Sequence, residues 1–182
     1  MELNVTLAGA SNAFVQKLDY ELNISGCKLA TDHDALDMFV YCIDPKECDV
    51  TDYDALLQAY EETAMALLDK VSVSLPLLDK GNKKRLCFAT TLNSSINYTK
   101  DCNHWERMIS ASCNMAIKTL FNRLSPLGYT FRVFAVDNYN KPEDASYAAE
   151  YFIKDRSLDN AIQHSDELRL VLRDRYEREY PW

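Results

Sequence analysis

The amino-acid sequence predicts a three-layer α/β/α domain with a mainly parallel sheet. Short apolar runs of strand length alternate along the chain with longer segments whose apolar residues recur at helical spacing. This alternation is typical of parallel strands joined by right-handed helical crossovers. The chain has 182 residues, the size of one domain, and shows neither an internal repeat nor a linker-like segment. We therefore expect residues 1–182 to form a single domain.

The strands are predicted from apolar runs that end at turn residues. The first run ends at Gly9, and the run over 36–43 that precedes Asp44-Pro45 is apolar apart from Asp37, as expected for a central parallel strand. The predicted strands cover residues 3–8, 27–31, 36–43, 85–91, 130–136 and 168–172.

The helices are predicted from apolar spacing and from capping residues. Asn12 is a suitable N-cap for the first helix and Gly26 a suitable stop, while Pro76 need only kink the helix that contains it. The predicted helices cover residues 14–24, 51–78, 105–124 and 145–154. The apolar residues at helical spacing on the helix over 105–124 are Met108, Ala111, Met115, Leu120 and Leu124.

The charge of the chain argues against nucleic acid as a partner. The formal net charge is −8 and the sequence pI is near 4.9, whereas binding to a phosphate backbone needs clustered lysine and arginine. No apolar run approaches the length of a membrane span, and the N-terminus has no features of a signal peptide. We therefore expect a cytoplasmic protein without a membrane partner.

The cysteines and the acidic residues predict no metal site. The six cysteines form no CxxC pair, and several lie inside apolar runs, which indicates reduced, buried thiols. Asp32-His33-Asp34 contains ligand-type side chains, but no second histidine follows at ligand spacing.

Several segments together resemble the short-chain dehydrogenase/reductases. Residues 112–124 (SCNMAIKTLFNRL) and 128–133 (GYTFRV) are similar to that family's fifth helix and sixth strand. The other matching segments are 36–40, 74–78 and 170–182. The resemblance covers nearly the whole chain and implies a Rossmann-like fold. It also implies a deletion, because the first helix and Leu36 leave room for one short strand where the family has two strands and a helix.

The family's dinucleotide-binding motifs are largely replaced. Its TGxxxGxG turn falls on Ala8, Gly9, Ala13 and Val15, its NNAG motif on Tyr41-Cys42-Ile43-Asp44, and its Pro-Gly after the sixth strand on Val136-Asp137. A phosphate-binding turn needs glycine where backbone meets pyrophosphate and where helix meets strand, and only Gly9 is retained. The resemblance therefore implies that no NAD or NADP binds.

The family's catalytic tetrad is replaced as well. Its asparagine, serine, tyrosine and lysine fall on Thr63, Asn93 (with Ser94 and Ser95 beside it), Glu106 and Ser110. A tyrosine serves as acid or base in hydride transfer only if a nearby cation lowers its pKa from about 10. Glu106 is no substitute, because a carboxyl group titrates about six units lower than a phenol. We therefore predict no catalytic residue among these positions.

The sequence predicts a non-catalytic relative of these reductases that acts as a dimeric or partner-binding scaffold. The helices over 51–78 and 105–124 match those that form the family's common dimer interface, so a homodimer is expected, with a homologous reductase as a further partner. Two alternatives remain: an atypical NAD(P)-dependent oxidoreductase, and a small-ligand sensor using an acidic cleft formed by Asp44, Glu106 and Asp137. Against such a cleft, Glu106 could simply face solvent in the first turn of its helix, where negative charge is favoured.

Overall fold

The computed structural model describes residues 2–29, 34–46, 49, 51–97, 104–140, 142–154, 166 and 169–182. The strands among them form one seven-stranded sheet in the order β2-β1-β3-β4-β5-β6-β7. Neighbouring strands from β2 to β6 pair in parallel, and β7 alone pairs antiparallel, with β6. The strands are β1 (Leu3–Gly9), β2 (Cys27–Leu29), β3 (Met38–Cys42), β4 (Arg85–Thr91), β5 (Thr130–Val136), β6 (Leu172–Arg173) and β7 (Glu179–Tyr180).

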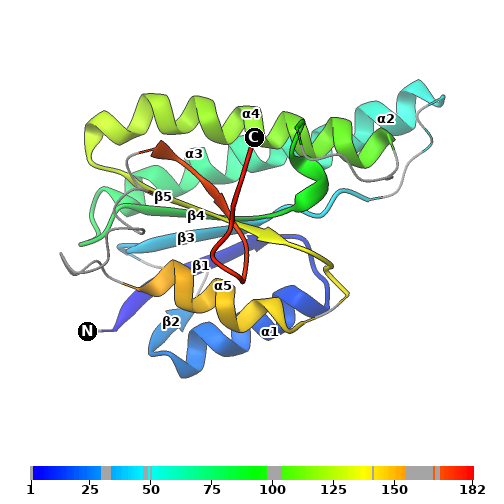
Figure 1. The fold of residues 1–182 in the computed structure, drawn as a ribbon. Helices are drawn as coiled ribbons and strands as arrows, with labels where there is room; N and C mark the ends of the chain where they lie inside the picture. Colours follow the sequence, from blue (N-terminus) through cyan, green and yellow to red (C-terminus); the bar gives the residue numbers. More distant parts are fainter. Residues whose placement is uncertain are drawn as a thin grey trace.

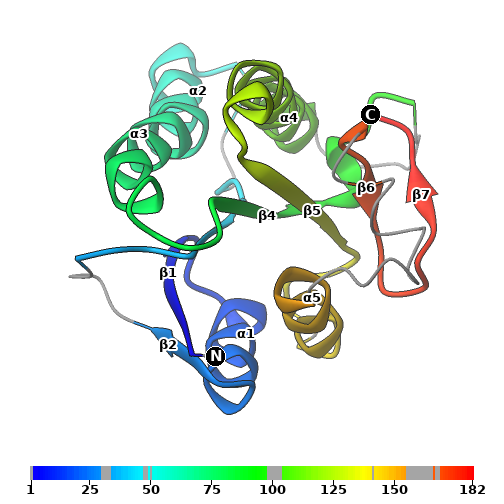
Figure 2. The same cartoon turned by 90° about the vertical axis from the view of Figure 1, so that its left-hand side faces the viewer.

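Helices cover both faces of this sheet. One layer contains α2, α3 and α4, and the other contains α1 and α5, as Figures 1 and 2 show from two directions. The helices are α1 (Ala13–Ile24), α2 (Tyr53–Tyr60), α3 (Ala66–Leu78), α4 (His104–Leu124) and α5 (Asp144–Ile153). The predicted three-layer, mainly parallel architecture is confirmed. None of the helices in the described part of the chain is both long and apolar enough to cross a membrane.

Alternation of side chains along the strands divides the core in two. On β3 and β4, Phe39, Tyr41 and Phe88 face the layer of α3 and α4, whereas Val40 and Cys87 face α1 and α5. Strands buried on both faces read as continuous apolar runs, which explains why the sequence located β4 and β5 at their observed bounds.

The deletion predicted between the first helix and Leu36 is also observed. The described residues between α1 and β3 contain only β2, a strand of three residues. Strand β1 therefore lies between β2 and β3, and the strand order reverses at β1. In open parallel sheets this reversal creates a crevice at the carboxyl ends of the strands, where ligands bind.

The long helix predicted over 51–78 is continuous but not uniform. Asp52 caps its start by accepting hydrogen bonds from the amides of Asp54 and Ala55. A π-helical turn, η1 (Glu61–Met65), then joins α2 to α3, and Pro76 lies in the last turn of α3.

The apolar residues that recur at helical spacing on α4 are not all on its buried face. Leu124 is buried, whereas Met108 and Met115 are exposed. The residues of α4 that are buried are Ile109, Ser110, Cys113, Asn114, Ile117, Phe121 and Leu124. The strand predicted over 168–172 was placed too early: among the described residues 169–173, strand is found only at Leu172–Arg173, because Leu170 has a positive φ of 54° that interrupts an extended chain.

The described cysteines Cys27, Cys42, Cys87 and Cys113 are free and buried, as predicted; Cys48 and Cys102 lie outside the described residues. Burial raises the pKa of the Cys113 thiol to about 12, so this thiol stays protonated at neutral pH.

Candidate functional site

A polar cleft lies at the carboxyl ends of β3, β4 and β5, beside the start of α4. Its volume is about 270 Å³. The lining residues are Asp44, Pro45, Thr91, Asn93, Trp105, Glu106, Asp137, Asn138, Tyr139 and Asn140. Strands β1 and β5 point toward this end of the sheet in Figure 1, on the right. The cleft therefore occupies the edge at which a parallel sheet binds its ligand.

The structure brings together the three carboxylates predicted to converge here. Asp44 follows β3, Asp137 follows β5, and Glu106 belongs to the first turn of α4. All three line the cleft, so Glu106 does not merely face bulk solvent. Among the described residues, however, no three carboxylate, histidine or cysteine groups are placed to hold a metal ion together. Asp32 and His33 lie outside the described residues.

Glu106 is held by uncharged groups. Its Oε1 accepts a hydrogen bond from Asn93 Nδ2 at 2.9 Å and a longer one from Thr91 Oγ1 at 3.4 Å. Asn93 is fixed in turn because its backbone amide donates to Thr91 Oγ1 at 3.2 Å. Two positions predicted from the catalytic tetrad, Asn93 and Glu106, are therefore in direct contact.

Asp44 is partly buried and close to another carboxylate. Burial raises the pKa of Asp44 above its usual value, and the negative charge of Glu106 raises it further. The hydrogen bond from Asn12 Nδ2 to Asp44 Oδ2, 2.9 Å long, acts in the opposite direction. Asp44 thus carries a charge that the surrounding protein only partly stabilises.

Tyr139 forms a buried wall of the cleft. Its side chain is 8% exposed, and its hydroxyl group has no hydrogen-bond partner in the described structure. Its ring packs edge-to-face on Phe14 with centroids 5.4 Å apart. Burial raises the pKa of Tyr139 well above its usual value, and Asp44 and Glu106 contribute to that shift. The phenol therefore stays protonated and lies within the electrostatic field of both carboxylates.

The turn between β1 and α1 does not fit a dinucleotide. The amide of Val15 donates to Asn12 Oδ1 at 2.9 Å, and the amide of Phe14 donates to the carbonyl of Tyr139 at 3.2 Å. These are amides that a helix N-terminus would offer to a pyrophosphate, and each has only one hydrogen to donate. Asp44, hydrogen-bonded to the same Asn12, adds negative charge where a pyrophosphate would need positive charge.

Gly9, which falls at a glycine position of the phosphate-binding turn in the resemblance, is required here by the local backbone conformation and packing. Its φ is +100°, and a Cβ atom at this position would lie 2.2 Å from the carbonyl oxygen of Cys42. The amide of the next residue, Ala10, donates to that same oxygen at 2.9 Å. Glycine is therefore needed for the close approach of β1 to β3.

Other predicted positions lie apart from the cleft. Tyr41 does not line it, because its side chain points from β3 into the core under α3 and α4. Ser95 is buried, and its hydroxyl donates to the carbonyl of Pro181 at 2.5 Å. Thr63 is buried in the π-helical turn. Ser110, one turn after Glu106 on α4, is fully buried with an unpaired hydroxyl, but it does not line the cleft.

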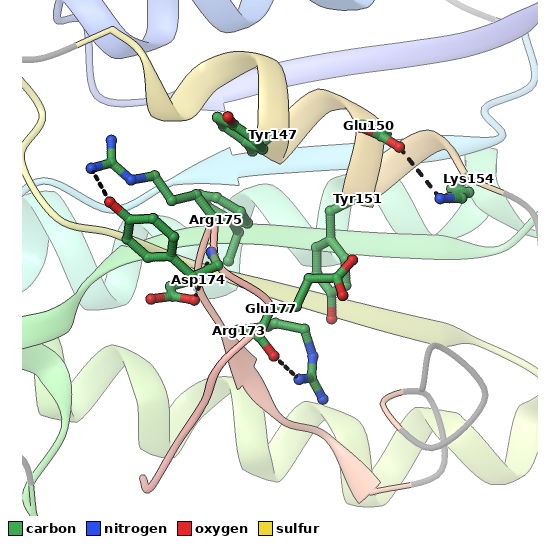
Figure 3. A pocket seen from close by; sticks show the side chains of 10 residues that line it. Tyr147, Glu150, Tyr151, Lys154, Arg173, Asp174, Arg175 and Glu177 are labelled. Atoms are coloured by element: carbon green, nitrogen blue, oxygen red, sulfur yellow. Dashed lines mark hydrogen bonds and ion pairs between the residues drawn. The ribbon is translucent and has the colours of Figure 1, made fainter. Parts of the chain in front are cut away.

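A second pocket, between α5 and the hairpin of β6 and β7, contains basic side chains that are already paired. Lys154 binds Glu150 at 3.3 Å, Arg175 binds Asp144 at 3.0 Å, and Arg173 binds Asp166 at 2.5 Å. Figure 3 shows the Lys154–Glu150 pair and the hydrogen bond from Arg173 to Glu177. We assign a structural role to this pocket, because none of these three cations needs a ligand for charge balance.

Comparison with solved structures shows the fold of the short-chain dehydrogenase/reductases. The chain is similar to the putative carbonyl reductase Sniffer of Caenorhabditis elegans, with a TM-score of 0.76 and 12% identity. It is also similar to a putative short-chain alcohol dehydrogenase from Burkholderia multivorans, with a TM-score of 0.74 and 10% identity. A carbonyl reductase from Pseudomonas aeruginosa, solved in complex with NADP, gives 0.71 and 12%. Each comparison covers 100% of both chains.

No family model matches the sequence, and a search of curated proteins returns no match. The similarity to these solved structures is therefore one of fold. It assigns no role to the residues that line the cleft of this chain.

Sequence reasoning did not assign Asn12, Trp105 or Tyr139 to the cleft. Asn12 had been identified only as a helix cap, yet it also binds Asp44. Tyr139 follows β5 and therefore lies at the same edge of the sheet as Asp44. Its place just after a predicted strand was the feature of the sequence that could have assigned it to the cleft.

Proposed function

We propose that this protein is a non-catalytic scaffold with the fold of a short-chain dehydrogenase/reductase, and that it forms a homodimer through α2, α3 and α4. The observation that carries the proposal is a set of large apolar side chains that are exposed on these helices. Its members are Tyr53, Leu57, Met65 and Val73 on the α2–α3 helix, and Met108 and Met115 on α4. Contiguous exposed apolar side chains on a protein mark interaction surfaces.

The spacing of these residues supports a helix-to-helix interface. Tyr53 and Leu57 are four residues apart on α2, and Met108 and Met115 are seven apart on α4, so each of these two pairs lies on one side of its helix. A twofold dimer would pack this face against its own copy and remove its apolar surface from water. A homologous reductase with a matching face is a variant of the same proposal.

The absence of catalysis is supported by the cleft. Glu106 and Ser110 take the places of the tyrosine and lysine, and the amides of Phe14 and Val15 are already hydrogen-bonded within the protein. Calorimetric titration with NADH and NADPH is expected to give no binding heat at millimolar concentration. Micromolar binding would contradict this part of the proposal and favour an atypical oxidoreductase.

The dimer is tested by light scattering coupled to size exclusion at tens of micromolar protein. We expect a dimer for the natural protein, and for Met115→Glu a dimer dissociation constant raised at least tenfold, because a charge would be buried at the interface without a partner. Ile24→Glu is the matched control, since Ile24 is 62% exposed on α1 in the opposite layer. A monomeric natural protein, or equal effects of the two substitutions, would contradict the proposal.

A further inference from the structure

We propose that the homodimer is arranged with α4 of one protomer on the α2–α3 helix of its partner, so that basic side chains of α4 face acidic side chains of α2 and α3. This inference rests on the dimer of the proposed function and deepens it, because it names the surface that each helix contacts. It is carried by the unequal distribution of charge over the two helices that bear the exposed apolar side chains.

The exposed surface of α4 is basic. Lys118 and Arg123 are exposed and Arg107 is partly exposed. The one acidic residue of α4, Glu106, lines the cleft at the strand ends. The exposed methionines of α4 are therefore accompanied by positive charge.

The α2–α3 helix has the opposite charge. Four acidic side chains are exposed on it, and its only basic residue is Lys70. The acidic residues are Asp54, Glu61, Glu62 and Asp69. Within one protomer, Glu62 is paired with Lys46, and no ion pair joins the described residues of α4 to those of the α2–α3 helix. These opposite charges are therefore available to a second copy of the chain.

Two arrangements of a twofold dimer pack these helices against their own copy. Strands β3, β4 and β5 are parallel, and the α2–α3 helix and α4 each connect one of these strands to the next. Both helices therefore run in the same direction, side by side in one layer (Figures 1 and 2). A twofold axis along the helices packs α4 on the partner's α2–α3 helix. A twofold axis across them, in the plane of the interface, packs each helix antiparallel on its own copy.

Electrostatics favours the first arrangement. When each helix packs on its own copy, the basic side chains of α4 face one another and the acidic side chains of α2 and α3 do the same. Such juxtaposition of like charges disfavours an interface, whereas opposite charges fix its register. When α4 packs on the partner's α2–α3 helix, every such contact joins opposite charges, and the twofold axis makes each contact occur twice.

Lys118 and Asp69 are the pair best suited to a test. Lys118 lies fourteen residues after the start of α4 at His104, and Asp69 lies sixteen residues after the start of α2 at Tyr53. Both helices begin at the carboxyl edge of the sheet and rise by about 1.5 Å per residue, so the two side chains lie at similar heights along the interface.

The experiment measures the dimer dissociation constant of the full chain by analytical ultracentrifugation. Lys118→Glu and Asp69→Lys should each raise this constant about fivefold or more, because each places like charges opposite one another twice in the dimer. The double variant should return to within about twofold of the natural protein, since the charges are then exchanged. A mixture of the two single variants should form mainly heterodimers in native mass spectrometry, because both helix pairs of the mixed dimer join opposite charges.

Lys28→Glu is the matched control, because it makes the same change of charge at an exposed position on β2, at the edge of the sheet. This variant should dimerise like the natural protein. A tighter dimer for Lys118→Glu and Asp69→Lys would overturn the arrangement and indicate that each helix packs on its own copy. Unchanged dissociation constants would overturn it as well. A monomeric natural protein would instead contradict the dimer itself, so the two failures are distinguishable.

Discussion

Ionisation of the Asp44 carboxyl group destabilises the folded protein. Its pKa is raised by burial and by Glu106, so the folded protein holds the proton of Asp44 to a higher pH than the unfolded chain does. The free energy of unfolding therefore falls as the pH rises from the unfolded pKa, near 3.8, through the folded pKa. A carboxylate that lines a cleft and destabilises the fold when it is charged is typical of functional sites, where perturbed pKa values cluster.

Asp44→Asn should consequently raise the melting temperature at neutral pH. Asparagine is neutral like the protonated carboxyl, and its side-chain oxygen can still accept the hydrogen bond from Asn12. We expect the gain to be largest at pH 7–8 and to shrink as the pH approaches 4, measured by thermal unfolding across that range. A gain that is independent of pH would mean that the charge of Asp44 is not its cause.

Gly9 is the residue whose backbone conformation and surroundings both exclude a side chain. In Gly9→Ala, the Cβ atom would meet the carbonyl of Cys42 in a conformation with φ near +100°. We expect a loss of roughly 2 kcal/mol or more in the free energy of unfolding, measured with urea. Gly26→Ala is the control, because Gly26 has a similar φ of +85° but no atom within 4 Å of the added Cβ. A similar loss in both would assign the effect to φ alone.

At the scale of elements, Asp174 organises the hairpin of β6 and β7. Its Oδ1 accepts from the amides of Tyr176 and Arg178 at 2.9 Å each, and its Oδ2 accepts from the guanidinium of Arg178 at 2.6 Å. The carboxylate thus adds to two backbone hydrogen bonds of the same connection, from the amide of Asp174 to the carbonyl of Arg178 and from the amide of Glu177 to the carbonyl of Asp174. The hairpin also positions the carbonyl of Pro181, which accepts the hydrogen bond from Ser95.

Asp174→Ala should lower the free energy of unfolding by about 2–3 kcal/mol, since it removes a buried carboxylate that accepts hydrogen bonds from two amides and a guanidinium. Urea denaturation gives the magnitude, and hydrogen exchange should locate the loss of protection at β7. Glu179→Gln, which removes the exposed pair with Arg169 and a longer one with Arg173 at 3.9 Å, is expected to cost less than about 1 kcal/mol. Equal losses would show that Asp174 has no special role in the hairpin.

The helices show where sequence periodicity succeeds and where it fails. The cap at Asn12 and the bounds of α4 within one residue were predicted, because capping and apolar spacing are local properties. The helical spacing did not show which of these residues are buried, because Met108 and Met115 share that spacing with the buried Leu124 but are exposed. Periodicity predicts a helix, whereas the burial of each residue depends on the elements packed against it.

For the whole molecule, dimerisation should couple stability to concentration. If the outer face of α2, α3 and α4 is buried in a dimer, the melting temperature of the natural protein should rise with protein concentration, because association stabilises the folded state by mass action. Scanning calorimetry at concentrations differing by about a hundredfold measures this rise. The rise should be absent in Met115→Glu and present in Ile24→Glu. A melting temperature independent of concentration in the natural protein would argue against a dimer linked to folding.

The sequence by itself determined the layered parallel architecture and the bounds of β4 and β5, since strands buried on both faces are largely apolar runs and these alternate with segments of helical spacing. The deletion after the first helix was predicted from the resemblance to the short-chain dehydrogenase/reductases. Only the tertiary structure placed Trp105 and Tyr139 beside the carboxylates that were predicted to converge. Tyr139 meets Asp44 and Glu106 because three strands end at one edge, and the amides of Phe14 and Val15 are occupied by contacts that depend on that arrangement. The physical reason is that hydrogen bonding and charge depend on distances in space, and these are set when the sheet assembles.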